Sequence, residues 1–267
     1  MTNEPTSAPE HTFIVMAYGD SPYLPACLDA LARQTVRSAL CIATSTPSDY
    51  LRAQAARIGA PLYETAPGRG IAHDWNFALQ LAKTRYVTLA HQDDLYAPAY
   101  AEKCLAAMRG CPDALICFTD YTELVGETER DNSLLLLVKR GILYFFMPWR
   151  RLKSRFWKTK LLSIGCPIAA PSVLYQVDHL GDFRFSADFS VNMDWDAWSR
   201  LALANGHFLF VPEKLVQHRI HPDSATTRGI AARRRQEEDE RMFRRFWPSA
   251  IARGLMRFYA LSYRSNE

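Results

Sequence analysis

RYVTLAHQDD, at residues 85–94, is the stretch of sequence that decides the fold. Its first six residues are mostly apolar or β-branched and predict a short buried strand, which ends in four polar residues. Apolar residues recur at helical spacing on both sides, over 71–83 and over 98–109, where Gly110 ends the pattern. A strand enclosed between two helices is the repeating unit of a parallel sheet.

The same alternation continues in both directions from this stretch. Apolar runs predict further strands at 12–17, 40–43, 61–64 and 114–119. Further helices are predicted at 23–33 and after Thr46, which we expect to be the N-cap of a helix that Gly59 ends. This order predicts an α/β fold, a single domain with a mostly parallel sheet and helices on both faces.

Such sheets bind ligands outside the carboxyl ends of their strands, where helix N-termini point inward. Polar residues follow three predicted strands there, at 18–20, 44–45 and 91–94. Carboxylate oxygens suit a divalent ion, and Asp93 with such an ion could neutralise a diphosphate leaving group. Paired acids after a strand are about as often an N-cap and a solvated turn, so this motif alone leaves both interpretations open.

The stretch 13–100 resembles glycosyltransferase family 2, of the GT-A type with a Rossmann-like sheet. The resemblance rests on a first strand ending in Ala17-Tyr18, on GIAHDWN at 70–76 before a helix, and on the D-x-D-like loop at 91–94. In the family the last acid of that triplet binds the metal, which implies Asp93 as a ligand of Mn²⁺ or Mg²⁺.

The motif MDWDAWSRLA, at 193–202, resembles the acidic motif of the family at the start of a helix, whose Asp is the catalytic base. This implies that Asp194 takes the proton of the acceptor hydroxyl as its oxygen attacks the anomeric carbon. The alternative for Asp194 is a structural acid in the first helical turn, where the helix dipole favours negative charge.

The motif HRIHPDSAT, at 218–226, resembles the late R-x-H-x-x-S loop of the family, in which the histidine completes the metal shell. His221 takes that place and His218 is the second choice, because imidazole is an ordinary ligand of manganese-type ions. Either could instead be a capped loop histidine. Arg228 is close enough in sequence to reach a phosphate.

The chain departs from the family pattern at three positions. Arginine often precedes the asparagine of the GIAHDWN segment in the family, whereas Trp75 precedes Asn76 here. An acid that contacts the nucleotide base usually ends the second strand, whereas Thr44 and Ser45 stand here, and their hydroxyls favour a pyrimidine donor, UDP or dTDP. His91 replaces the first acid of the triplet and becomes a third candidate ligand at a site with fewer carboxylates. The resemblance implies further donor contacts, at Ala17, Tyr18, Asp20, Asp74, Asn76, Gln92 and Asp94.

The resemblance as a whole implies a metal-dependent, inverting hexosyltransferase. It would move a sugar from a nucleoside diphosphate to a saccharide or lipid-linked saccharide in polysaccharide or glycoconjugate synthesis. The alternative is a non-catalytic saccharide- or membrane-binding scaffold, against which Asp93, Asp194 and His221 argue. The Gly-rich loops of nucleotidyltransferases and dinucleotide oxidoreductases are missing after the first strand, at 18–22.

Composition sets the remaining expectations. The 267 residues carry a net charge of +4 and six cysteines without a C-x-x-C pair, which indicates reduced core thiols in a cytoplasmic protein. Residues 1–10 are expected to be a disordered lead-in without a secretory pattern, and we expect no transmembrane segment.

The segment 132–177 contains no acidic residue and alternates cations with leucines and aromatic side chains. This composition predicts an insert that contacts an anionic membrane at the inner face of the plasma membrane, and the alternative is a core-packing helix pair with a solvated basic face. No nucleic-acid motif accompanies it, so no nucleic-acid partner is expected. The expected organisation is a glycosyltransferase domain over 11–230 that includes this insert, followed by a helical tail over 231–267.

Overall fold

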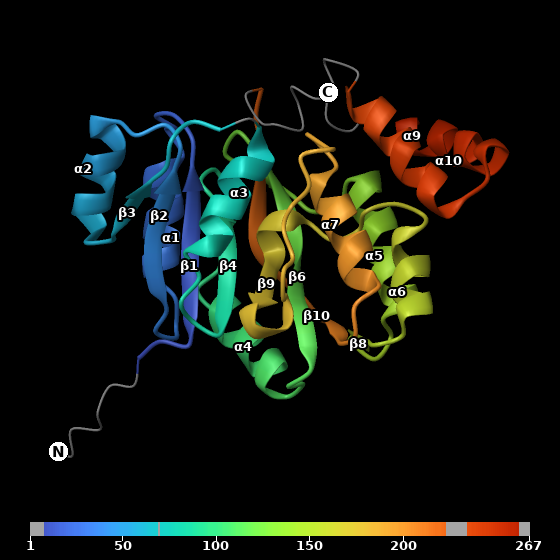
Figure 1. Cartoon of the computed structure of the whole chain (residues 1–267), viewed down its shortest axis with the longest axis horizontal. Coiled ribbons are helices and arrows are strands. Elements are labelled where there is room, and N and C mark those ends of the chain that lie inside the picture. Colours follow the sequence, from blue (N-terminus) through green and yellow to red (C-terminus); the bar gives the residue numbers. More distant parts are fainter. Residues whose placement is uncertain (1–7, 69, 223–233, 262–267) are drawn as a thin grey trace.

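The computed structural model of the chain describes residues 8–68, 70–222 and 234–261 (Figure 1). Within these residues the strands form one ten-stranded sheet with the order β3-β2-β1-β4-β9-β6-β10-β5, to which β7 and β8 add at β6 and β10. Helices cover both faces of this sheet (Figure 1). The α/β class and the two covered faces are confirmed.

The sheet has a parallel half and a mixed half. The parallel strands are β1 (His11–Ala17), β2 (Ala39–Thr44), β3 (Leu62–Glu64) and β4 (Tyr86–His91). In the mixed half the long strands β6 (Ala114–Val125) and β10 (His207–Ile220) run parallel, and β9 (Val173–Gln176) lies antiparallel between β4 and β6. Three short antiparallel strands complete it, β5 (Leu95–Tyr96), β7 (Thr128–Arg130) and β8 (Arg151–Leu152).

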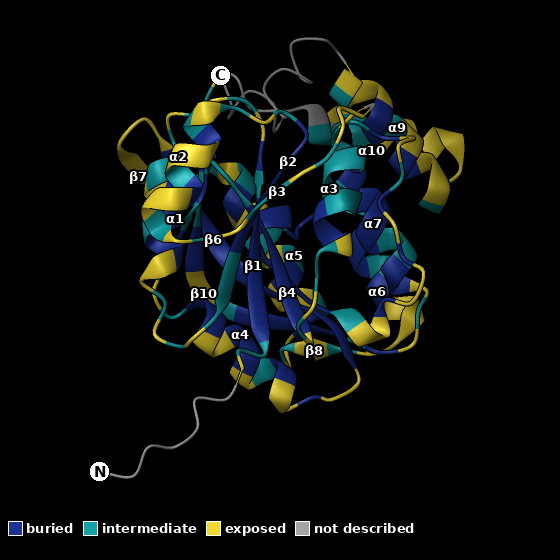
Figure 2. Ribbon diagram, turned by 60° about the vertical axis from the view of Figure 1, so that its left-hand side comes forward, coloured by how far each residue is buried: buried dark blue, intermediate teal, exposed yellow. Residues whose placement is uncertain are grey.

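Two hydrophobic cores lie on the two faces of the sheet. One core packs under α1 (Leu24–Ala32), α2 (Asp49–Ile58) and α4 (Tyr100–Arg109). The other packs under α3 (Ile71–Gln80), α5 (Leu134–Phe146), α6 (Arg155–Leu162) and α7 (Met193–Ala202), and α9 (Arg234–Phe246) and α10 (Ser249–Leu261) extend it. Two 3-10 turns, η1 (Ala170–Ser172) and η2 (Val177–His179), flank β9. Figure 2 shows the strands buried and the outer surfaces of the helices exposed.

The start of α2 differs from the prediction. Ser48, not Thr46, is the N-cap, because its hydroxyl accepts the backbone N–H of Leu51 at 3.2 Å. The Thr46 hydroxyl instead accepts the N–H of Gly19 at 2.8 Å and ties the loop after β2 to the loop after β1. Gly59 ends the helix as predicted, in a left-handed conformation with φ 65° that glycine adopts without steric cost.

The cysteines have the expected structural role. All six are free and buried. Among the described residues no helix combines the length and the apolar character that crossing a bilayer requires.

Candidate active site

Three strands and two helices bring their polar ends to one edge of the sheet. Strands β1, β2 and β4 are parallel, and their register places Ala17 beside Thr44 of β2 and Met16 beside His91 of β4. Helices α3 and α7 both begin above this edge (Figure 1). This is the edge at which the sequence predicts a ligand.

Asp93 and His221 form the centre of the site. The Nε2 atom of His221 lies 2.9 Å from Oδ2 of Asp93, which joins the loop after β4 to the end of β10 across 128 residues of sequence. Burial raises the pKa of Asp93, but the hydrogen bond to His221 and the nearby imidazoles of His91 and His218 outweigh it, so the pKa falls below its ordinary value. Asp93 is therefore an anion that a divalent ion could bind.

Asp94 fixes the loop after β4 to strand β10. Its side chain is fully buried, and its Oδ1 accepts the backbone N–H of Arg219 at 2.8 Å and faces Nδ1 of His218 at 3.0 Å. Burial lowers the pKa of His218, but Asp94 and Asp93 outweigh it and raise that pKa to about 9. The neighbouring carboxylates therefore favour the imidazolium form of His218 at neutral pH.

The residues around Asp93 fit a divalent metal. Ligand atoms of His91, Asp93 and Asp94 lie within 4.8 Å of one another. Three buried atoms of His91, Asp94 and the neighbouring His221 have no hydrogen-bond partner within the described residues, namely Nε2 of His91, Oδ2 of Asp94 and Nδ1 of His221. Unsatisfied buried nitrogen and oxygen atoms are costly, and coordination to an ion with mixed oxygen and imidazole ligands would satisfy such atoms.

Two side-chain amides hold the walls of the site. Gln92 accepts the N–H of Tyr18 at 3.1 Å and donates to its carbonyl at 3.0 Å, which extends the pairing of β1 with β4 by one residue. Asn76 does the same to Phe185, at 2.7 Å and 2.9 Å, and so joins α3 to the loop before α7. Both amides are therefore occupied within the protein. The Trp75 ring contacts the rings of both His91 and Phe185 edge-on, with centroids 5.1 Å and 5.0 Å apart.

The loops after β1 and β2 are bonded to each other. Asp20 accepts the Ser48 hydroxyl at 2.6 Å, and the Thr44 hydroxyl accepts the N–H of Thr46 at 3.0 Å. Thr44 and Ser45 are both buried, whereas the ring of Tyr18 is 61% exposed beside them. Tyr18 and Asp20 are therefore the exposed residues here that a ligand approaching the edge could contact.

Asp194 lies in the first turn of α7, partly buried near this edge. Its Oδ1 accepts the N–H of Trp195 at 2.7 Å, and the thiol of Cys166 lies 3.9 Å from its Oδ2. Burial raises the pKa of Asp194, although Arg235, Lys139 and His91 are close enough to oppose that effect. A carboxylate with a raised pKa is a stronger base than a solvated one.

The sequence analysis did not identify Glu238, which holds the loop in front of Asp194. Its carboxylate accepts the N–H groups of Ser190, Val191 and Asn192, each at 2.8 Å, and the Ser190 hydroxyl at 2.7 Å. Asp239 next to it accepts the side-chain amide of Asn192. Helix α9 therefore fixes the backbone that leads into α7. The charged pattern of 234–241 gave no sign that these two acids are buried.

Two predicted residues remain, Asp74 and Arg228. Asp74 is partly exposed in the first turn of α3, above the edge. Arg228 lies outside the described residues.

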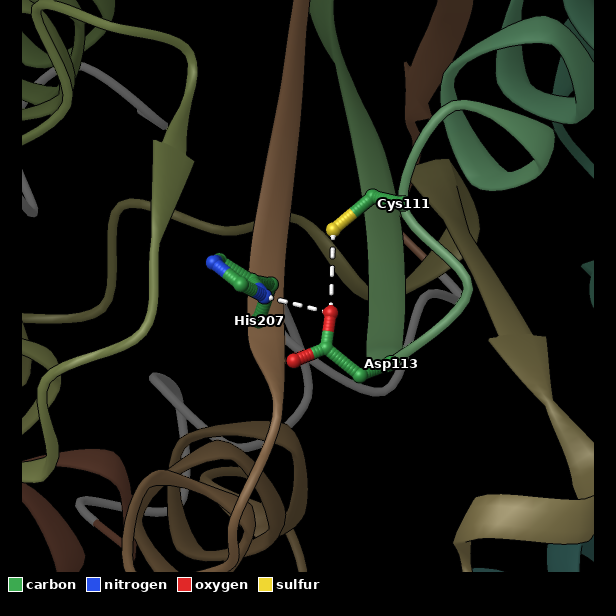
Figure 3. Close-up of side chains that lie close together, drawn as sticks. All are labelled: Cys111, Asp113 and His207. Carbon is green, nitrogen blue, oxygen red and sulfur yellow. Dashed lines mark hydrogen bonds and ion pairs between the residues drawn. The ribbon is translucent and has the colours of Figure 1, made fainter.

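A second cluster of metal-type side chains lies at the opposite edge of the sheet (Figure 3). Asp113 accepts the Cys111 thiol at 3.3 Å and faces Nδ1 of His207 at 2.8 Å. Its other oxygen accepts Nζ of Lys153 at 2.9 Å, and that bond is the largest cause of the lowered pKa of Asp113. Burial raises the pKa of Cys111 to about 11, so its thiol is protonated. These bonds hold the starts of β6 and β10 together.

Solved structures with a similar fold include glycosyltransferases. The mannosyltransferase PcManGT from Pyrobaculum calidifontis, solved with GDP-Man and Mn²⁺, is 16% identical, with a TM-score of 0.64 over 98% of this chain and 72% of that one. S. aureus TarS 1–349 with UDP-GlcNAc is 13% identical, with a TM-score of 0.62 over 96% and 73%. The chain spans 42% of a longer TarS chain, at 13% identity and a TM-score of 0.58 over 92% of this chain.

The sequence itself matches the family model described as glycosyl transferase family 2, over residues 12–171. No curated protein sequence is similar enough to count as a relative. The family model covers more than half of the chain and includes β1, β4 and Asp93. The chain belongs to glycosyl transferase family 2.

Proposed function

We propose that this chain is an inverting, metal-dependent hexosyltransferase that moves a sugar from UDP or dTDP to a saccharide or lipid-linked saccharide in polysaccharide or glycoconjugate synthesis. The observation that carries the proposal is the pairing of Asp93 with His221 at 2.9 Å, at the sheet edge above which α7 presents Asp194. Membership of the family supports sugar transfer from a nucleotide donor.

Asp93, His221 and His91 would hold a Mn²⁺ or Mg²⁺ ion. The ion would supply positive charge against the diphosphate as negative charge develops on it. The unpartnered buried atoms of His91, Asp94 and His221 support such an ion, as does Mn²⁺ in the structure of PcManGT.

Asp194 would act as the base. Its carboxylate takes the proton of the acceptor hydroxyl while that oxygen bonds to the anomeric carbon and the bond from that carbon to the diphosphate breaks. One displacement of this kind inverts the anomeric centre. The raised pKa of Asp194, which burial causes, supports this role.

The donor would lie along the loops after β1, β2 and β4. Tyr18 is exposed there for stacking, and the hydroxyl side chains of Thr44 and Ser45 end β2, where we place a pyrimidine base. TarS and the glucosyl-3-phosphoglycerate synthase of Mycobacterium tuberculosis were solved with uridine nucleotides, which supports UDP. Ala17, Asp20, Asp74, Asn76, Gln92, Asp94 and Arg228 are proposed to line or support the donor site. Six free buried cysteines support a cytoplasmic location.

The base assignment is tested with Asp194→Asn. The amide keeps the shape of the side chain but cannot take the proton, so transfer should fall at least about a thousandfold, the upper range of general-base catalysis. Donor affinity, measured by calorimetry with Mn²⁺ and UDP-sugars, should stay within about twofold. Full transfer by Asp194→Asn would refute the role of Asp194, and the lack of any donor binding by the wild type would favour a non-catalytic scaffold.

A further inference from the structure

Exposed apolar side chains concentrate in one region of the chain. Among the described side chains twelve large hydrophobic residues are exposed, and eight of them lie between Leu134 and Trp157. The region consists of α5, the turn after it and the start of α6, which lie side by side at one end of the sheet (Figure 1). This region is far from the loops after β1 and β2 at the other end.

Helix α5 has the reverse of the usual surface pattern. Its outward face carries Leu134, Leu137, Val138, Tyr144 and Phe145, whose spacing of three, four, ten and eleven residues from the first places them on one side of a helix. Leu134 and Phe145 are 72% and 75% exposed. A surface helix normally turns its apolar face to the core and its charges to water.

The two cations of α5 point into the protein instead. Lys139 donates to the hydroxyl of Tyr121 at 2.9 Å, and Arg140 forms an ion pair with Asp120 at 2.8 Å. Leu136 and Leu143 are buried on the same inward side. The charges of α5 therefore anchor the helix to β6, and its outer face has no charge to keep it in water.

The exposed apolar surface continues beyond α5 into the turn after it and the start of α6. Trp149 is 82% exposed, Phe156 60% and Trp157 50%, and the rings of Phe146 and Trp157 lie 6.2 Å apart, which joins the two helices into one surface. We call the eight exposed residues the apolar patch. Its tryptophans and tyrosine are of the kind that lie at the boundary between lipid and water.

Arg151 and Arg155 are exposed within the same segment. Arg155 donates to the neutral amide of Asn205 at 2.8 Å and so keeps its charge uncompensated. No residue between 132 and 177 is acidic, and Asp113, which lies outside the segment, is paired with Lys153. The surroundings of the apolar patch are therefore positively charged.

We propose that the apolar patch docks the protein on the surface of an anionic bilayer, with Arg151 and Arg155 at the lipid headgroups. Exposed leucine, phenylalanine and tryptophan side chains with flanking arginines suit the boundary of an anionic headgroup layer, whereas a protein partner would need acidic side chains placed to pair with these arginines. The proposal goes beyond the sugar transfer proposed above and does not depend on it.

The test is flotation of the full chain with vesicles of phosphatidylcholine, and with vesicles in which half of the lipid is phosphatidylglycerol. Arg151→Gln/Arg155→Gln should partition about thirtyfold more weakly to the anionic vesicles, because each cation near such a surface contributes about fivefold. A matched control is Arg33→Gln/Arg37→Gln, which removes two exposed arginines from the segment between α1 and β2 and should bind as the wild type does.

Leu137→Gln/Phe145→Gln/Trp149→Gln should lose anionic binding at least tenfold, which is about 1.4 kcal/mol, while its Tm stays at that of the wild type because the three side chains are exposed. If the triple variant unfolds, the test rests on the vesicle binding of Arg151→Gln/Arg155→Gln. The proposal is overturned if the wild type does not float with anionic vesicles, or if both variants float as the wild type does. Self-association in sedimentation velocity that the triple variant abolishes, without vesicle binding, would also overturn it and assign the patch to a second copy.

Discussion

Glu238→Gln is the substitution that most sharply separates the proposed base from the proposed donor site. Glu238 lies on α9 and touches neither Asp93 nor the loops after β1 and β2 among its described hydrogen bonds. It fixes the backbone from Ser190 to Asn192, which leads directly into the turn of α7 that carries Asp194. We therefore expect this variant to lower transfer but not donor binding.

The free-energy cost of Glu238→Gln follows from the four hydrogen bonds that the Glu238 carboxylate accepts. Glutamine keeps one acceptor oxygen, which can hold the two bonds from Ser190, but its NH₂ group would face the N–H groups of Val191 and Asn192. Two lost bonds to a charged acceptor cost about 3–6 kcal/mol in total if the loop stays in place. The loop should move instead, since local rearrangement costs less than two unsatisfied donors in a buried position.

The assay compares transfer rate, donor affinity and urea unfolding in Glu238→Gln and in Glu240→Gln. Glu240 lies two residues away on the same helix and forms only an exposed ion pair with Arg244 among the described contacts, so its loss should cost less than about 1 kcal/mol. We expect Glu238→Gln to lower the rate at saturating donor at least tenfold at unchanged donor affinity. Equal loss of affinity and rate, or wild-type transfer, would refute the reasoning.

Two further predictions concern stability. Burial lowers the pKa of His11 to about 3, so below the unfolded pKa of 6.5 the unfolded chain binds a proton that the folded chain does not. The contribution of His11 to stability should therefore fall by about 2 kcal/mol between pH 7 and pH 5, and urea titrations of the wild type and of His11→Asn should differ in their pH dependence by that amount. Gly206→Ala places a Cβ 2.6 Å from the carbonyl of Asp113 at a φ of +126°, and it should cost about 3 kcal/mol. Gly254→Ala, with open space around its Cβ, should be neutral or slightly stabilising, and equal Tm values of the two variants would contradict this account.

Local periodicity was enough to predict the core of the fold. The strands 12–17 and 85–90 are nearly those observed, because buried parallel strands are short apolar runs that end where polar residues begin. The strand predicted at 114–119 continues to Val125, and the extension was missed because its acids are buried with partners from elsewhere. Asp120 pairs with Arg140 and Glu123 with Arg130, and no local pattern shows such pairs.

The candidate site was predictable as an order of motifs but not as a set of contacts. The sequence placed Asp93 before His221, and the structure brings these two side chains together. The pairing of Asn76 with Phe185 spans 109 residues, and that of Glu238 with Asn192 spans 46. Such bonds depend on how the helices pack on the sheet, which the spacing of residues along the chain does not encode.

The cations of the segment 132–177 also show that composition does not predict which side chains point inward. Their number predicts a strongly basic surface, yet Lys139, Arg140 and Lys158 all point inward, and Lys158 donates to the carbonyls of Ala204 and Gly206. The exposed apolar patch is therefore a stronger feature of this segment than its charge.

The most direct test of the account is the melting temperature of the wild type, of Asp93→Asn and of Asp113→Asn, each with Mn²⁺ and a series of nucleotide sugars. A donor at one hundred times its Kd stabilises the folded state by about 2.7 kcal/mol, which for a chain of this size raises the Tm by about 5–8 °C. The wild type and Asp113→Asn, whose substitution lies at the opposite edge of the sheet, should both show this rise with a UDP- or dTDP-sugar, and Asp93→Asn should not. An undiminished rise in Asp93→Asn, or its loss in Asp113→Asn alone, would contradict a donor and metal site at Asp93.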